Sequence, residues 1–315
     1  MDFISALLNS MPGAVTQGLI WGIMAIGVYI TFRILDIADL TVDGSLCTGG
    51  AVCVVLTLNG CPTWLALLAA LAAGMLAGLV TGIFHTFCGI PAILAGILTQ
   101  LALYSINLRI MGWGTENGSR SNLPISVDKY DLMVSSRYVR ELSLDNPLPK
   151  LIIFLAVIIL VLYWLFGTET GCALRATGAN ENMAKAQGIN TSFTKVLGLM
   201  ISNGLVALSG GLLSQYQGFS DINMGRGAIV IGLAAVIIGE VILERVFRNF
   251  ALKLAACAIG AIIYYIVIQF VLRLGLSTDD LKLLTALVVM LFLAIPYWKG
   301  RYFNRPGKKG AKSNA

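Results

Sequence analysis

The sequence predicts an all-α polytopic membrane protein with about nine membrane segments, because it is apolar overall and its charges are confined to a few stretches. Its residues are 57% hydrophobic and 12% charged, whereas about a quarter of the residues of a soluble domain are charged. No Asp, Glu, Lys or Arg occurs between Asp43 and Arg109. One bilayer crossing takes roughly 20 residues, so this run holds several crossings. Apolar runs recur along the chain, which predicts a single transmembrane domain over residues 1–315.

The predicted membrane segments follow the apolar runs. They cover residues 14–32, 45–58, 63–84, 91–110, 149–166, 192–216, 227–241, 251–272 and 281–295. Segments 45–58 and 227–241 are short, and each follows a polar stretch that contains Asp. They hold matching places in two runs of four segments, and counting crossings gives these runs opposite orientations. This pattern indicates an inverted repeat with broken helices; ordinary loops beside tilted helices are the alternative.

Basic residues after the last apolar run set the predicted orientation. They lie in the tail 297–315 and are Lys299, Arg301, Arg305, Lys308, Lys309 and Lys312. Basic residues beside a membrane segment hold the cytoplasmic side and attract anionic lipid. The net charge of +6 therefore indicates membrane lipid, and no nucleic acid, as the partner. The membrane is expected to be the cell (plasma or inner) membrane. Counting back from a cytoplasmic C-terminus puts the loop 168–192 on its cytoplasmic side, and the loop 112–148 and the N-terminus on its outer side.

The polar loop 168–192 contains the signals of a short helix. Asn180 is a good N-cap, residues 181–187 fit one to two helical turns, and Gly188 suits a left-handed helix end. A helix this short is marginal alone in water. We therefore expect it to dock, either on the ends of its own membrane helices or on a partner at the surface.

The same loop contains Gly171, Arg175, Ala176, Asn180, Glu181, Ala184, Gly188, Ile189 and Asn190. In these residues it resembles the cytoplasmic coupling loop of permease subunits of ABC importers, above all those of the branched-chain amino acid type. A second block, residues 32–45, is similar to a subgroup often paired with binding proteins for tryptophan or tyrosine. The resemblance implies that the loop seats in a cleft of a separate ATPase subunit.

Within the loop, we expect Met183, Ala184 and Gln187 to form the exposed knob of the short helix. Arg175 has two possible roles. Its guanidinium is a rigid fork of donors that can pair with a carboxylate of the ATPase or cap carbonyl groups at the ends of its own helices.

The candidates for the transport pathway are polar residues in or beside the broken segments. They are Asp39, Asp43, Ser45, Asn203, Asp221 and Asn223. Two of them have structural alternatives. Asp43 is suited to capping a helix N-terminus, and Asn203, inside segment 192–216, can bond a neighbouring helix.

Small residues predict close helix contacts. Gly74, Gly78 and Gly82 recur at every fourth position, which forms a smooth stripe on one helix face. The stripe fits packing within one subunit or, alternatively, a dimer seam.

The sequence carries no sign of enzyme chemistry. It has no Walker A motif, and its six cysteines and single histidine, His85, lack metal-ligand spacing. We therefore expect no cofactor on this chain, with ATP and Mg²⁺ held by a partner ATPase. The resemblance also implies an extracytoplasmic binding (lipo)protein and a second permease copy or a paralogue. The loop 112–148 is the expected landing place of the binding protein; a mobile lid and a cover over the helix ends are the alternatives for this loop.

The function indicated is import of a small solute, which the resemblance suggests is an amino acid, with an aromatic one as an option. An ion-coupled secondary transporter and a passive channel are the alternatives. The middles of the long segments contain no charged residue, which argues against a proton-coupled carrier. A channel has no need of a docking loop.

Overall fold

The computed structural model describes residues 3–114, 118–126, 129–130, 132–139, 146–243 and 249–273, with a few positions between 283 and 294. The predicted tail 297–315 and most of the predicted segment 281–295 lie outside the described residues.

Eight helices match the first eight predicted segments, with ends within a few residues except at the start of the first helix. They are α1 (Phe3–Tyr29), α2 (Val42–Leu58), α3 (Thr63–Thr86), α4 (Ala92–Met111), α5 (Pro147–Gly167), α8 (Thr191–Gln217), α9 (Ala228–Leu243) and α10 (Phe250–Arg273). In the part of the chain described, six of these are long and apolar enough to cross a membrane, whereas α2 and α9 are shorter. The prediction of an all-α polytopic membrane protein is confirmed.

The helix ends follow local chemistry. Pro62 and Pro91 directly precede α3 and α4, where the missing N–H of proline costs no helical hydrogen bond. Gly218 ends α8 in the left-handed conformation, with a φ of 79°, which glycine adopts without strain. At the other end of the bundle, α1 continues into a short π-helix, η1 (Ile30–Ile34), and the chain then leaves the helix before α2.

Two pairs of packed helices organise the bundle. Helix α3 packs along α8, and α10 packs along α1, while α1 and α8 also contact each other. Ser202 and Ser209 of α8 donate hydrogen bonds of 2.8 Å to the backbone carbonyls of Gly27 and Ile20 in α1. The short helices α2 and α9 pack on α8 and α1 respectively. Each long central helix thus has one long and one short companion.

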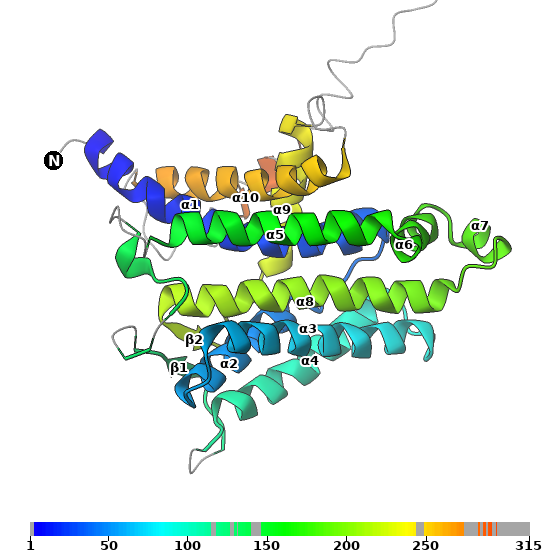
Figure 1. Ribbon diagram of the computed structural model, residues 1–315, viewed down its shortest axis with the longest axis horizontal. Helices are drawn as coiled ribbons and strands as arrows, with labels where there is room; N and C mark the ends of the chain where they lie inside the picture. Colours follow the sequence, from blue (N-terminus) through cyan, green and yellow to red (C-terminus); the bar gives the residue numbers. More distant parts are fainter. Residues whose placement is uncertain are drawn as a thin grey trace, which may run out of the picture.

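The two central helices form the core, and α4 and α5 lie at its edge. Most of α1 and α8 is buried, whereas less than a third of α4 and of α5 is buried. Figure 1 shows the helices α6 (Glu169–Ala179) and α7 (Glu181–Ala186) at one end of the bundle, with the N-terminus at the other end.

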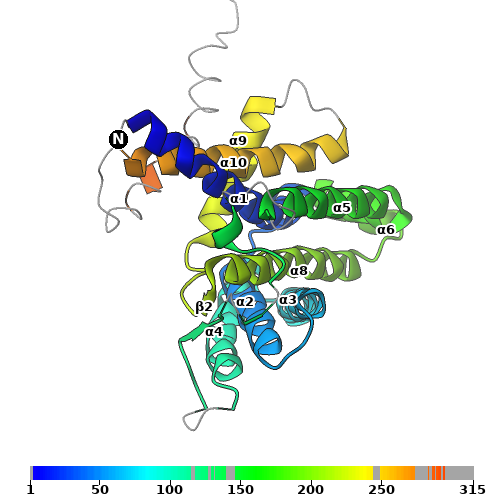
Figure 2. The ribbon, with the colours of Figure 1, turned by 60° about the vertical axis from the view of Figure 1, so that its left-hand side comes forward.

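A small antiparallel sheet lies at the end of the bundle that holds the N-terminus. Strand β1 (Asn122–Pro124) pairs with β2 (Phe219–Asp221), and Leu123 lies opposite Ser220. A single 3-10 turn, η2 (Ser136–Tyr138), follows in the same loop. Figure 2 shows β2 beside α2. The sheet ties the loop 112–148 to the break between α8 and α9.

Candidate functional site

The loop 168–192 folds as two helices. Helix α7 matches the predicted one, and α6 precedes it as an additional helix of 11 residues. The Thr168 hydroxyl caps α6 by accepting a hydrogen bond from the Gly171 amide. Sequence reasoning missed α6 because its two internal glycines, Gly171 and Gly178, have low helix propensity. Both are closely packed: Gly171 lies against the backbone of Phe166 in α5, and Gly178 against the Ile34 carbonyl of η1.

Two asparagines and a glycine delimit α7. The Asn180 side chain accepts a 3.0 Å hydrogen bond from the Met183 amide at the start of α7. Gly188 follows the helix with a φ of 81°. The Asn190 side chain accepts a 3.1 Å hydrogen bond from the Phe193 amide and so caps α8. The helix starts and stops where the sequence indicates.

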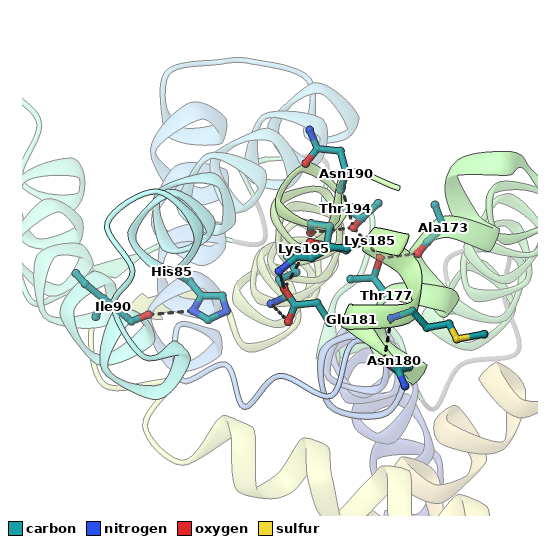
Figure 3. A network of polar contacts seen from close by, with 12 residues as sticks. His85, Ile90, Ala173, Thr177, Asn180, Glu181, Lys185, Asn190, Thr194 and Lys195 are labelled. Carbon is teal, nitrogen blue, oxygen red and sulfur yellow. Dashed lines mark hydrogen bonds and ion pairs between the residues drawn. The ribbon is translucent and has the colours of Figure 1, made fainter. Parts of the chain in front are cut away.

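Glu181 attaches α7 to α8 (Figure 3). Its carboxylate lies 2.7 Å from Nζ of Lys195 in α8 and 3.0 Å from Nζ of Lys185 in α7. The hydrogen bonds from Lys195 and then Lys185 lower the pKa of Glu181 from 4.5 to about 2. The hydroxyl groups of Thr177 and Thr194, 2.9 Å apart, join α6 to α8. The loop is therefore held by its own membrane helix.

Arg175 adopts the second of its two expected roles. Its guanidinium donates a hydrogen bond to the backbone carbonyl of Phe166 near the end of α5. The same group lies over the rings of Phe166 and Phe250, with its carbon 5.9 and 5.0 Å from the ring centroids, in positions suited to cation–π attraction. Arg175 thereby ties α6 to α5 and α10.

One of the three residues expected to be exposed at the short helix α7 is buried. Met183 is 64% exposed and Gln187 is exposed, but Ala184 is buried. Ala184 lies three residues after Glu181 and therefore on the same helix face, which Glu181 turns toward α8. The amide of Ile189 also folds back to bond the Ala184 carbonyl at 3.0 Å. The prediction that Ala184 is exposed was wrong.

Beside the loop helices lies an open groove of about 570 Å³ between α6 and the start of α8. Its lining includes Cys172, Ala176, Ile189, Phe193 and Leu197. Ala176 and Ile189, both predicted loop residues, thus face this groove.

Three pathway candidates meet at one buried cluster around Asn203. The Asn203 amide NH2 group donates a 2.6 Å hydrogen bond to an Asp39 carboxylate oxygen, and the Asn203 amide oxygen accepts a 2.6 Å hydrogen bond from the Ser45 hydroxyl. The second oxygen of Asp39 accepts from the Thr41 amide at 2.9 Å. Asp39, Ser45 and Asn203 are all buried. The cluster fastens the first chain break to the middle of α8.

Asp43 caps a helix, but not its own. Its two carboxylate oxygens accept 3.0 Å hydrogen bonds from the Gly227 and Ile229 amides at the start of α9. Asp43 itself lies in the first turn of α2. The N-termini of both short helices therefore converge on one carboxylate, and each carries a partial positive charge of about one half.

Asp221 and Asn223 lie apart from this cluster. One Asp221 oxygen accepts a 2.7 Å hydrogen bond from the Asn223 amide, and the other accepts from the Asn122 side chain of β1. Asn223 is exposed. These contacts shape the turn after β2, and the structure does not bring the two residues to Asn203.

The glycine stripe of α3 faces α8 within the chain. Gly74 and Gly78 lie directly against the Asn203 and Leu199 carbonyls, and a Cβ atom on Gly82 would approach the Cα atom of Val196 to 3.0 Å. Helix α1 uses Gly18 and Gly22 in the same way against α10. The close approach thus serves packing inside this chain.

Sequence reasoning missed two contacts that join distant segments. Arg33 of η1 pairs with Glu240 of α9 at 2.9 Å, and Cys47 of α2 donates to the Ile222 carbonyl and accepts from the Gly225 amide. No local pattern marks residues that lie so far apart in the chain. Among the described residues, no group of three His, Cys, Asp or Glu could hold a metal ion.

Two short apolar helices whose N-termini meet at Asp43, packed among long apolar helices, are typical of polytopic membrane transport proteins. Residues 10–294 match the family described as "Branched-chain amino acid transport system / permease component". The chain belongs to this family, and it is a permease component of an ABC-type importer.

Relatives extend over almost the whole chain. The tyrosine transport system permease protein of Clostridioides difficile (strain R20291) is 41% identical over 91% of each chain. An uncharacterized protein of Rickettsia prowazekii is 37% identical over 91% of this chain and 98% of its own. The ribose import permease protein of Escherichia coli (strain K12) is 25% identical over 91% of this chain and 85% of its own.

One solved structure shares the fold. It is PsaBC from Streptococcus pneumoniae in complex with Fab, matched with a TM-score of 0.50 and 15% identity over 96% of this chain and 95% of that chain. This likeness concerns the arrangement of the helices alone.

Proposed function

We propose that this permease imports an amino acid, with aromatic amino acids as the first class to test, and that a separate ATPase drives it. The similarity to a tyrosine transport permease supports the choice of solute. ATP and Mg²⁺ belong on the ATPase. A binding protein delivers the solute from outside, and a second permease copy or a paralogue completes the pathway.

The observation that carries this proposal is the construction of the loop 168–192. Ion pairs, caps and the Arg175 contacts hold α6 and α7 to α5, α8 and α10, while Met183 and Gln187 project from the end of the bundle. A loop that is firmly attached on one side and exposed on the other can transmit a conformational change of the partner ATPase to the membrane helices. We place this loop and the tail 297–315 in the cytoplasm.

At the opposite end, the loop 112–148 is the proposed landing place of the binding protein. Its pairing with β2 joins it to the break before α9. A protein that binds at β1 would thus contact a segment connected to the short helix α9. With this orientation, we infer that the N-terminus lies on the outer side of the cell membrane and that the domain 1–315 spans it.

The test is reconstitution in proteoliposomes with the ATPase and the binding protein encoded by neighbouring reading frames. We expect uptake of tyrosine or tryptophan that requires ATP, the ATPase and the binding protein together, and no such uptake of ribose. Full-rate uptake by the permease alone would instead identify a channel. Uptake that follows an ion gradient without ATP would identify a secondary transporter.

A further inference from the structure

Helices α4 and α5 are the least buried of the six long helices described, but their exposed faces differ in chemistry. The exposed face of α5 is apolar along the middle of the helix; its residues include Ile152, Ile153, Val157, Leu160 and Val161. Such a face suits lipid tails. Helix α4 exposes apolar residues on one side, among them Leu94, Leu98 and Leu101. Along one edge, however, it carries Gln100, Tyr104 and Asn107.

The spacing of these three residues places them on one edge of the helix, since positions i, i+4 and i+7 align. Tyr104 is 43% exposed, Gln100 is half-buried and Asn107 is buried. Amide groups facing lipid are costly because no water is there to bond them. The edge is thus poorly suited to lipid, although it borders the exposed surface of the bundle.

The polar edge lies beside the point where the N-termini of the short helices α2 and α9 meet. A Cβ atom on Gly44 would lie 3.3 Å from the Gln100 Cα atom, and the Asn107 amide group donates to the Gly44 carbonyl at 3.4 Å. Gly44 directly follows Asp43, which caps α9. Figure 2 shows α4 alongside α2 in this half of the molecule.

One atom of this edge lacks a partner. Asn107 Oδ1 is a buried acceptor with no hydrogen bond among the described residues. Buried acceptors are generally paired with protein or water, so an unpaired one beside a helix junction indicates that a donor arrives from elsewhere. An amide oxygen accepts a hydrogen bond from the ammonium group of an amino acid, the class of solute proposed above.

We propose that the α4 edge formed by Gln100, Tyr104 and Asn107 is the wall of a water-filled pathway, and that it contacts an amine-bearing solute through Asn107 Oδ1. This inference rests on the proposed function for the identity of the solute, but not for the presence of water. The exposed apolar face of α5, by contrast, contacts lipid tails.

The first arm of the test measures access of water. Single cysteines replace Gln100 and Tyr104 in α4, with Ile153 and Val157 of α5 as controls. The background carries Ser at the accessible positions Cys61, Cys88 and Cys172. The complex with its ATPase, in lipid bilayers, is treated with a positively charged methanethiosulfonate reagent. We expect the α4 positions to react at least about tenfold faster than the α5 positions, although Ile153 is more exposed than Tyr104 in the isolated chain.

The second arm measures solute contact. Asn107→Leu should lower uptake about fivefold through a raised KM, because the hydrogen bond to the solute is lost. Asn107→Asp loses the amide donor to the Gly44 carbonyl as well but keeps the acceptor, so it should retain more activity. The transported amino acid should slow labelling at position 104. Equal, slow labelling on both helices would overturn the pathway wall. Fast labelling with unchanged uptake in Asn107→Leu would overturn solute contact. Fast labelling in a complex that transports no amino acid would keep the wall and reject the proposed function.

Discussion

Replacing Asp43 by Asn tests whether one carboxylate holds two helix N-termini together. Asn has nearly the same shape but no charge, and it offers one acceptor oxygen where Asp43 offers two. One of the 3.0 Å hydrogen bonds from Gly227 and Ile229 is then lost. A matched control is Asp36→Asn, which removes a charge from an exposed position in the same break.

The expected cost follows from two contributions. A lost hydrogen bond of this kind costs about 1 kcal/mol, and a negative charge near a helix N-terminus contributes about 0.3–1 kcal/mol for each of α2 and α9. Together these give about 2 kcal/mol, equivalent to a melting temperature lower by about 4 °C for a chain of this size.

The assay is thermal unfolding of purified permease in one detergent, followed by the amount of monodisperse protein that remains after heating. Asp43→Asn should melt several degrees below wild type, and Asp36→Asn should melt with wild type. Equal melting of the two variants would show that the junction of α2 and α9 does not depend on the carboxylate.

Two further predictions concern the attachments of the loop and of α3. Because the folded-state pKa of Glu181, about 2, lies below its ordinary 4.5, its ion pairs stabilise the protein above pH 4.5 and lose this effect as the pH falls through about 2. The Glu181 side chain is more than a third exposed, so Glu181→Gln should lower the free energy of unfolding by only about 0.5–1 kcal/mol at pH 7. The melting temperatures of variant and wild type should converge as the pH falls toward 2. A difference that stays constant with pH would contradict the ion-pair account. Gly78→Leu forces α3 away from the α8 backbone and should lower the free energy of unfolding by about 1–3 kcal/mol or abolish folding. The control Leu76→Ala, on the exposed face of α3, should melt near wild type. Equal effects of the two substitutions would contradict the packing of α3 on α8.

The membrane helices could be predicted because their apolar length and their flanking residues are local properties. Pro62, Pro91 and Gly218 mark ends that depend on the backbone of one residue. In the same way, Asn180 and Gly188 were sufficient to place α7, since caps act within one turn.

Contacts between distant segments could not be predicted in this way. The sequence indicates that Asp43 can cap a helix, but only the fold brings the start of α9 to it. The pairing of β1 with β2 joins two three-residue strands, too short to leave an alternating pattern. Ala184 is buried because Glu181 finds Lys195 in the next helix, and α6 forms despite weak propensity because Arg175 and Thr177 bind it to neighbours.

The proposed role of the loop 168–192 can be tested at its exposed face. Because Ala184 is buried, substitution there would disturb the loop itself, whereas Met183 and Gln187 are accessible to a partner. The most direct measurement is ATP-driven uptake and solute-stimulated ATP hydrolysis by the reconstituted importer carrying Met183→Asp or Gln187→Asp, with Met183→Leu as control. We predict that the Asp variants insert and melt like wild type but lose most uptake, about tenfold or more for the desolvation of a new charge at an interface, while Met183→Leu transports normally. Wild-type uptake and wild-type ATPase stimulation in both Asp variants would remove this loop from the coupling of the motor to the pathway.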